Sequence, residues 1–164
     1  MIPTGIRKVE GTMRVAVGCD HAGYTLKKMV IDYLKERGHE ILDEGTFSEE
    51  SCDYPDYALR VATRVARGEV DRGILICATG IGMAMAANKV PGVRAAVAND
   101  IYTARYSRLH NDANVLAMGA RVIGPGLARA ILETWMETEF EGGRHEKRLE
   151  KMACIERGER DGGA

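Results

Sequence analysis

The chain has 164 residues, 45% of them hydrophobic and 29% charged, which is enough to bury one core and short for two. Its 23 basic and 24 acidic side chains nearly cancel, and this balance excludes the strong net field that attracts nucleic acids or anionic membranes. Any anionic ligand must therefore be held by a local cluster of basic side chains.

Apolar runs that favour strands alternate along the chain with amphipathic stretches that favour helices. In the first half, strands are predicted at Arg14–Val17, Glu40–Leu42 and Gly73–Ile76, and helices at Tyr24–Arg37 and Pro55–Arg67. In the second half, strands are predicted at Arg94–Val97 and Val115–Met118, and helices from within Gly80–Gly82, from Asn99 or Asp100, at Leu127–Glu137 and at Arg144–Arg157. The predicted fold class is α/β, with a five-stranded parallel sheet built from βαβ units.

Glycine, proline and capping residues set several of these boundaries. Gly38 and Gly68 each follow a predicted helix, where a residue in the left-handed conformation commonly ends it. Pro55 suits the first turn of its helix, because that position leaves the backbone amide unpaired in any case. Asn99 or Asp100 can cap the fourth helix with a side-chain oxygen.

The last predicted helix, RHEKRLEKMACIER, is highly charged and has a thin apolar stripe. The stripe contains Leu149, Met152 and Ile155, and a single chain offers it little apolar surface on which to dock. We therefore expect this helix to reach toward a dimer partner. The predicted domain is residues 13–157, with an N-terminal extension at residues 1–12 and a C-terminal tail at residues 158–164.

The cysteine pattern and the lengths of the apolar segments indicate the cellular compartment of the protein. Cys19, Cys52, Cys77 and Cys154 form no C-x-x-C pair and no dense framework of the kind that staples small secreted domains. The first residues lack an apolar core of signal-peptide length, and no segment approaches the roughly 20 apolar residues of a membrane helix. We expect a cytoplasmic protein with free thiols and neither membrane nor nucleic acid as a partner.

Three segments rich in reactive groups are candidates for one pocket, because ligands of open parallel sheets bind beyond the carboxyl ends of the strands. The first follows the first strand and contains Cys19, Asp20 and His21. The second is the run CATGIGM, residues 77–83, after the third strand. The third is the triplet of His110, Asn111 and Asp112 at the end of the fourth helix.

Cys77 ends an apolar strand and faces a glycine-rich turn that leads into a helix, where positive dipole character favours a thiolate that can act as a base. A buried structural cysteine is the alternative, and position alone does not decide between them. After Thr79, Gly80 and Gly82 permit several backbone amides to approach one anion. An ordinary strand-to-helix turn would contain the same glycines.

The other candidate residues each have a plain structural alternative. Asp20 and His21 suit sugar binding and proton transfer, but also a helix cap beside an exposed imidazole. His110 and Asn111 suit an acid or base beside an amide donor, but also a polar helix end. Tyr54 can line a pocket or simply begin a helix.

Late in the chain stands a basic set that suits a phosphate, with Arg121, Arg144, His145 and Arg148 as its members. Arg144 and Arg148 are four residues apart and project from one side of the terminal helix. The alternative is a mixed-charge helix surface without a ligand, since acidic residues are interspersed among them.

Five motifs stand in one order along the chain: GCDHAGYTLK, DYPDYA, GILICATGIGMAMAANKVPGVRA, HNDANVLAMGARVIG and EGGRHEKR. Together they resemble the type B ribose-5-phosphate isomerases over about residues 13–157. That family also includes galactose-6-phosphate isomerase subunits and enzymes that act on allose 6-phosphate. The resemblance implies a single Rossmann-like three-layer α/β/α sandwich, a homodimer or tetramer with shared active sites, and no metal or organic cofactor.

The resemblance also implies an activity, the interconversion of ribose 5-phosphate and ribulose 5-phosphate in the pentose phosphate pathway through an enediolate. Cys77 matches the carbon base, and Thr79 matches the hydroxyl that moves protons between O1 and O2. His110, with Asp20, matches the pair that opens the furanose ring. The residues that match the substrate-binding groups are Asn111, Gly80 and Gly82 for the enediolate, His21, Arg121, Arg144 and Arg148 for the phosphate, and Tyr54 for the pocket wall.

Two positions depart from parts of the family. One branch lacks the cysteine and has a glutamate at the position of Met83, so this chain matches the cysteine-base branch. Ala78 stands where a glycine often follows the cysteine, which leaves the fine shape of the loop open.

Two other classes of function compete with the isomerase. A nucleotide-binding domain is favoured by TGIG and by Asp43 near the end of the second strand, although the turn after the first strand lacks G-x-G-x-x-G. A sugar-phosphate binding module without catalysis would keep the pocket and lose the reaction. The preference among ribose, allose and galactose phosphates depends on pocket shape and stays open.

Overall fold

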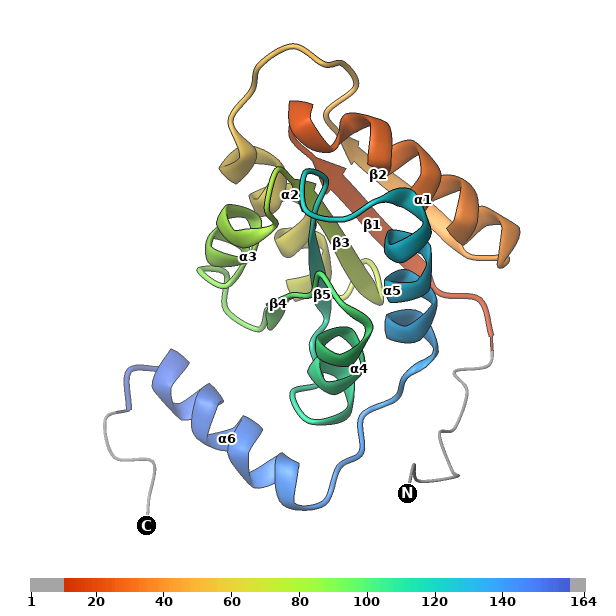
Figure 1. Cartoon of the computed structure of the whole chain (residues 1–164). Coiled ribbons are helices and arrows are strands. Elements are labelled where there is room, and N and C mark those ends of the chain that lie inside the picture. The colour runs from red at the N-terminus through yellow and green to blue at the C-terminus, as the bar shows by residue number, and fades with distance from the viewer. Residues whose placement is uncertain (1–10, 160–164) are drawn as a thin grey trace.

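The computed structural model of the chain describes residues 11–159 (Figure 1). Residues 1–10 and 160–164, which make up most of the predicted extension and tail, lie outside the described residues. The strands are β1 (Arg14–Cys19), β2 (Glu40–Gly45), β3 (Arg72–Cys77), β4 (Ala95–Val97) and β5 (Val115–Gly119). They form one sheet in the order β2-β1-β3-β5-β4, and every neighbouring pair is parallel.

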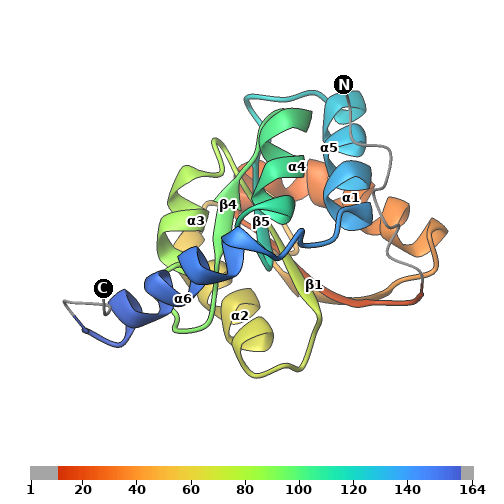
Figure 2. The same cartoon turned by 90° about the horizontal axis from the view of Figure 1, so that it is seen from below.

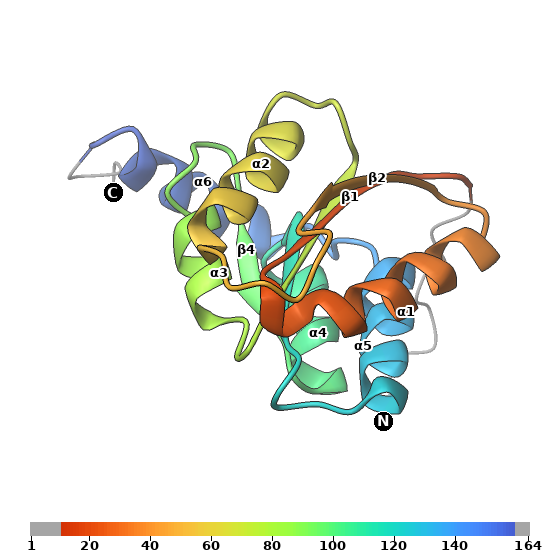
Figure 3. The ribbon, with the colours of Figure 1, turned by 90° about the horizontal axis from the view of Figure 1, so that it is seen from above.

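Helices cover both faces of the sheet. The helical elements are a short 3-10 helix η1 (His21–Gly23), α1 (Tyr24–Glu36), α2 (Tyr54–Ala66), α3 (Ile81–Ala87), α4 (Ile101–Leu109), α5 (Pro125–Glu137) and α6 (Arg144–Glu156). Apolar residues of α1, α4 and α5 pack on one face, and those of α2 and α3 pack on the other (Figure 3). The predicted α/β/α sandwich around a five-stranded parallel sheet is confirmed.

The boundaries differ from the predicted ones mainly at the ends of the strands. β1 and β3 continue through Cys19 and Cys77, because pairing with neighbouring strands extends to both cysteines. The 3-10 helix η1 was not predicted. It forms because the Asp20 side chain accepts hydrogen bonds from the amides of Ala22 and Gly23. α5 begins at Pro125, which its fixed φ suits for a first turn, instead of at Leu127.

The two ends of the strands define two edges of the sheet. We call the edge with the last residues of β1, β3 and β5 the carboxyl edge and the edge with their first residues the amino edge. Because β3 has six residues, the two edges are about 17 Å apart at roughly 3.3 Å per residue. The turns from β1, β3 and β5 into α1, α3 and α5 lie at the upper end of Figure 1, and α6 lies at the lower end.

Helix α6 extends away from the sandwich on the side of the amino edge (Figure 2). Two hydrogen bonds connect the two ends of this region to the sandwich. Before the helix, the Glu141 amide donates to the Leu109 carbonyl at 3.0 Å, and near its last residue the Gly92 amide donates to Glu156 Oε1 at 3.0 Å. Met152 and Ile155 of its predicted apolar stripe are 47% and 74% exposed. The helix therefore leaves apolar surface uncovered by its own chain, as its composition predicts.

None of the helices within residues 11–159 combines the length and the apolar character that crossing a membrane requires.

Candidate active site

Cys77 is the last residue of β3 and lies in a tight glycine-rich turn. Its side chain is buried, and the Gly80 amide donates a hydrogen bond to Sγ at 3.1 Å. Gly80 has φ of 81°, and a Cβ there would lie 3.0 Å from the backbone of Met118. Only glycine meets both conditions without strain, so the residue type at position 80 directs an amide at the sulfur.

Thr79 lies on the solvent side of the same turn, and a side chain from another loop fixes it. Its Oγ1 accepts from the Ile81 amide at 3.2 Å. Asn99 Nδ2 donates to the Thr79 carbonyl at 3.2 Å, and Asn99 Oδ1 accepts from the Gly119 amide at 2.8 Å. Asn99 thus joins the turn after β3 to the end of β5. The sequence offered either Asn99 or Asp100 as the cap of α4, and because Asp100 is the cap, the Asn99 side chain is available for this role.

Asp20 and His21 lie at the same carboxyl edge. Asp20 is buried, its amide donates to the Ile76 carbonyl at 3.1 Å, and its Oδ1 accepts from the amides of Ala22 and Gly23 at 2.9 and 3.2 Å. His21 Nδ1 accepts from the Cys52 amide at 3.2 Å. A neutral ring with Nδ1 as acceptor carries its proton on Nε2, which leaves an N–H donor for an anion.

Tyr54 and Arg121 complete the carboxyl-edge group. Tyr54 begins α2, and its ring lies so close to α3 that a Cβ on Gly82 would be 2.6 Å from the Tyr54 ring carbon Cζ. The Arg121 amide donates to the Ala78 carbonyl at 3.0 Å, and its side chain is exposed. The carboxyl-edge group is Asp20, His21, Tyr54, Cys77, Thr79, Gly80, Gly82 and Arg121.

The remaining predicted residues lie at the opposite edge. His110 caps the carboxyl end of α4, Asn111 follows it, and the chain then enters β5 at Val115. Arg144 and Arg148 are exposed on α6, on the same side of the sandwich (Figure 2). Within one chain, the third predicted segment therefore does not join the other two, because a helix between parallel strands returns its carboxyl end to the amino edge.

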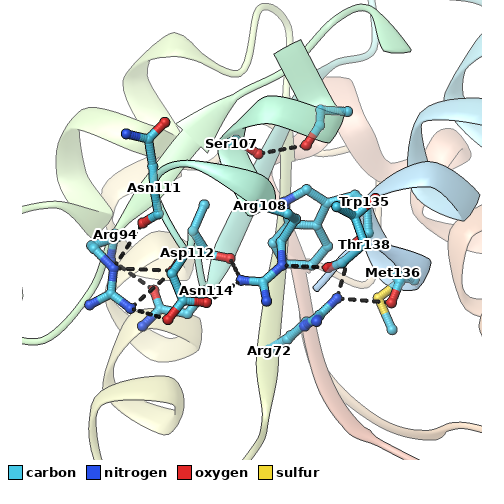
Figure 4. A network of polar contacts seen from close by, with 12 residues as sticks. Arg72, Arg94, Ser107, Arg108, Asn111, Asp112, Asn114, Trp135, Met136 and Thr138 are labelled. Carbon is cyan, nitrogen blue, oxygen red and sulfur yellow. Dashed lines mark hydrogen bonds and ion pairs between the residues drawn. The ribbon is translucent and has the colours of Figure 1, made fainter. Parts of the chain in front are cut away.

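A network of arginines holds the turn that carries Asn111 (Figure 4). Asp112 has φ of 43°, which is uncommon for a residue other than glycine. Arg94 donates to the carbonyls of Asn111 and Asp112 at 2.9–3.2 Å. Arg108 donates to Asp112 Oδ1 at 2.8 Å and to the Ala113 carbonyl at 2.6 Å. The turn is thus fixed in an unusual conformation by charged hydrogen bonds.

The guanidinium groups of two buried arginines, Arg72 and Arg108, lie 5.1 and 5.8 Å from the centre of the Trp135 ring (Figure 4). Arg72 donates to the carbonyls of Trp135 and Met136 at 2.9 and 3.0 Å, and Arg108 donates to the Thr138 carbonyl at 3.1 Å. Burial lowers the pKa of Arg72 to about 9, and the charge of Arg108 adds to this effect. These arginines satisfy the carbonyls at the end of α5, a role that their sequence context did not indicate.

The side chain of His110 lies in an aromatic cluster at the amino edge. Its ring stacks on His145 with centroids 4.1 Å apart, and Tyr106 packs edge-on against it at 4.7 Å. Glu141 Oε2 is 3.6 Å from the Nε2 atoms of both histidines. Burial lowers the pKa of His145, and the neighbouring charges of His110 and Arg144 lower it further.

Among residues 11–159, His110, Glu141 and His145 form the one trio whose ligand atoms all lie within 4.8 Å of each other, which is close enough to consider a metal ion. The two imidazole planes are only 16° from parallel. An ion in the plane of one ring would therefore lie out of the plane of the other, where that ring's nitrogen has no lone pair directed at it. The stack would have to open before one ion could bind both nitrogens.

Asp43, which the nucleotide-binding hypothesis requires as a ribose acceptor, already has partners. Its Oδ1 accepts from Lys27 Nζ at 2.7 Å and from the Gly45 amide at 3.0 Å. Lys27 is 2% exposed and also donates to the Thr46 carbonyl at 2.6 Å. The carboxylate neutralises a buried ammonium, so its presence near the end of β2 has a structural cause.

A family model described as Ribose/Galactose Isomerase matches residues 15–152 of the chain. Ribose-5-phosphate isomerase B of Escherichia coli (strain K12) is 52% identical over 143 residues, which are 87% of this chain and 96% of that protein. The match to the family begins in β1 and ends within α6.

Two solved structures share the fold at a level that leaves little of either chain unmatched. Ribose-5-phosphate isomerase B of Clostridium thermocellum has a TM-score of 0.88 and 55% identity, and the match covers 89% of this chain and 99% of that one. The enzyme of Mycoplasma genitalium, with bound ribulose 5-phosphate, has a TM-score of 0.85 and 39% identity, and the match covers 88% and 96% of the two chains.

Proposed function

This chain belongs to the ribose/galactose isomerase family, and we propose that it interconverts ribose 5-phosphate and ribulose 5-phosphate. The Escherichia coli relative is named for this activity, and the Mycoplasma genitalium relative binds the ketose. The observation that carries the proposal is the turn after β3, where the Gly80 amide donates to Cys77 Sγ at 3.1 Å. A sulfur fixed at the carboxyl edge of a parallel sheet lies where such folds bind ligands.

The reaction needs one group that moves a proton between carbons and another that moves a proton between oxygens. In the direction of ketose formation, the Cys77 thiolate takes the proton from C2 and delivers it to C1. The Thr79 hydroxyl moves a proton from O2 to O1. Amides near Gly80 and Gly82, with the Asn111 side chain, stabilise the negative charge of the enediolate.

A complete site requires two chains. Cys77 and Thr79 lie at the carboxyl edge, whereas His110 and Asn111 lie at the amino edge about 17 Å away, which no side chain spans. In a two-fold dimer, the carboxyl edge of one protomer faces the amino edge of the other, and the arrangement forms two equivalent sites. The apolar side chains that α6 leaves exposed support such an interface.

Basic side chains from both edges would then surround the phosphate. His21 presents an Nε2–H donor and Arg121 a guanidinium at the carboxyl edge, and Arg144 and Arg148 come from α6 of the second protomer. This local cluster provides the positive charge that the nearly neutral chain lacks overall. Holding the phosphate fixes C1 and C2 relative to the sulfur.

The test is a ketose-formation assay with purified protein and ribose 5-phosphate, allose 6-phosphate and galactose 6-phosphate. We expect the highest kcat/KM with ribose 5-phosphate, because the Escherichia coli relative is named for that sugar and the Mycoplasma genitalium relative has ribulose 5-phosphate bound. Exchange of the C2 hydrogen with deuterated solvent should accompany turnover. Binding of all three sugars without exchange would indicate a binding module and contradict the proposal.

A further inference from the structure

One carboxylate at the amino edge faces two stacked imidazoles. Oε2 of Glu141 is 3.6 Å from Nε2 of His110 and 3.6 Å from Nε2 of His145. The two rings are stacked with centroids 4.1 Å apart. Both Nε2 atoms therefore lie at the same distance from one carboxylate oxygen.

The buried imidazole of His145 has a ring proton without an acceptor, and Glu141 is the carboxylate next to it. His145 is 3% exposed, and its Nε2 has no hydrogen-bond partner among the described residues. The Arg148 guanidinium lies 3.4 Å from His145 Nδ1, and a guanidinium can only donate, so the ring proton of a neutral His145 is on Nε2. A buried donor without a partner is uncommon and requires an explanation. A small approach of Glu141 would satisfy it.

The ring of His110 is held between aromatic neighbours. Tyr106 packs edge-on at 4.7 Å with planes 69° apart, and His145 stacks on the ring at 4.1 Å. The ring is 34% exposed, so part of it faces solvent. With Nε2 next to Glu141, Nδ1 is the nitrogen that remains for a ligand, because the two nitrogens of an imidazole point in different directions.

We infer that Glu141 is a positioning residue for His110, whose carboxylate keeps the His110 proton on Nε2 and leaves Nδ1 to exchange a proton with the sugar. This inference rests on the ring-opening role that the proposed function gives to His110. The arrangement matches the general logic of a carboxylate that orients a catalytic histidine and stabilises its cationic form. Contacts of 3.6 Å are ion-pair distances, and such contacts commonly shorten when the substrate binds.

The ring-opening step then balances without another reagent. Nδ1 of His110 takes the proton of the hydroxyl on C1, and the electron pair of that O–H bond forms the C1 carbonyl. The bond between C1 and the ring oxygen breaks, and its electron pair stays on the ring oxygen. The imidazolium delivers the proton to that oxygen, which becomes a hydroxyl.

The test compares Glu141→Gln with Glu146→Gln in the full-length protein. Both glutamates are exposed, and within residues 11–159 only Glu141 is paired with the two histidines, so Glu146 is the matched control. Turnover is measured from ribose 5-phosphate, which is mostly a furanose, and from ribulose 5-phosphate, which forms no ring because its C5 oxygen carries the phosphate. We expect Glu141→Gln to lower kcat about tenfold or more on the furanose and less than about twofold on the ketose. Glu146→Gln should match the wild type.

A spectroscopic measurement tests the tautomer independently of turnover. The chain has four histidines, so ¹⁵N-histidine labelling gives few signals, and His110→Asn assigns the one that matters. We expect His110 to be protonated on Nε2 in the wild type and to become a mixture of tautomers in Glu141→Gln.

The outcomes separate this inference from the proposed function. Wild-type protein that isomerises neither sugar would overturn the proposed function, and this inference with it. An active wild type whose furanose-to-ketose ratio is unchanged in Glu141→Gln would overturn the inference alone. Equal losses on both sugars, with a lower melting temperature, would reduce Glu141 to a structural role and would also overturn it.

Discussion

Two cysteines end neighbouring strands of the sheet, and their surroundings give them different chemistry. Burial raises the pKa of Cys19 to about 12, so this residue remains a thiol at any physiological pH. Cys77 ends β3, two residues before solvent-exposed Thr79, and its sulfur accepts a hydrogen bond from the Gly80 amide. Of the two, only Cys77 combines a fixed sulfur with access to the carboxyl edge.

A pair of matched substitutions tests this difference. We expect Cys77→Ala to lower turnover of ribose 5-phosphate by about 10²-fold or more, because the proton of C2 loses its acceptor. Cys19→Ala is the matched control, because it removes the same side-chain atom from another buried strand end. It should leave turnover within about twofold of the wild type. Fluorescence titration with the sugar phosphate should show that Cys77→Ala still binds. Near-normal turnover by Cys77→Ala would exclude it as the carbon base.

The protonation of His145 predicts how stability changes with pH. Burial lowers the pKa of His145 in the folded state, whereas the same side chain in the unfolded chain has its ordinary pKa of about 6.5. Below pH 6.5 the unfolded chain therefore binds a proton more readily than the folded one. This contribution to stability is therefore complete above pH 6.5 and is lost as the pH falls below it. Urea unfolding at pH 5.5 and 7.5, at one protein concentration, should show a smaller difference for His145→Gln than for the wild type. His39, whose pKa burial also lowers, accounts for part of the remaining slope.

At the scale of elements, the turn between α4 and β5 depends on opposite charges more than on backbone preference. Asp112 has positive φ and binds Arg94 and Arg108, of which Arg108 is 6% exposed. Removing the carboxylate leaves a buried guanidinium without its counter-charge, and that loss is larger than the relief of strain at one residue.

Three substitutions of Asp112 separate these effects. Asp112→Ala should lower the free energy of unfolding by about 2–3 kcal/mol. Asp112→Gly relieves the positive φ and should recover only about 1 kcal/mol of that loss. Asp112→Asn, which tolerates the conformation and keeps an acceptor, should lose least. Chemical denaturation measures all three, and a Gly variant as stable as the wild type would show that strain dominates.

Most of the elements follow from the sequence, and so does half of the site. The apolar runs that become β1, β3 and β5 locate the strand ends to within two residues, and Cys77 and Asp20 therefore lie at the carboxyl edge as predicted. The position of His110 could also have been found, because β5 follows it and the helix before a parallel strand must return to the amino edge. Glu141 could not, since it comes from the segment between α5 and α6, whose path depends on tertiary contacts.

At the scale of the whole molecule, the proposed sharing of each site between two edges would make activity a property of two chains. Homodimers of Cys77→Ala lack the carbon base in both sites, and homodimers of His110→Asn lack the ring-opening group in both. In a mixed dimer, one site carries both defects and the other carries none. Equal mixing should therefore restore about one quarter of wild-type turnover on ribose 5-phosphate.

The experiment mixes the two variants after partial unfolding and refolding, and it uses each variant alone, treated in the same way, as the control. A mass measurement confirms that mixed dimers form. Recovered turnover that rises with the fraction of mixed dimers supports sites shared between chains. Mixed dimers without recovered turnover would place each complete site in one chain and contradict the two-edge arrangement.

The opposite placement of Cys77 and His110 also determines how many sites of the proposed mixed dimer remain active. An altered chain that lacks one of the two groups inactivates one site of its dimer with a wild-type chain and leaves the other site active. An altered chain that lacks both groups inactivates both sites, because each site needs one of the two groups from that chain. Co-produced in equal amounts with normal chains, the doubly altered protein should inactivate every normal chain that it pairs with, whereas either single alteration should leave one working site per normal chain, as in the wild-type dimer.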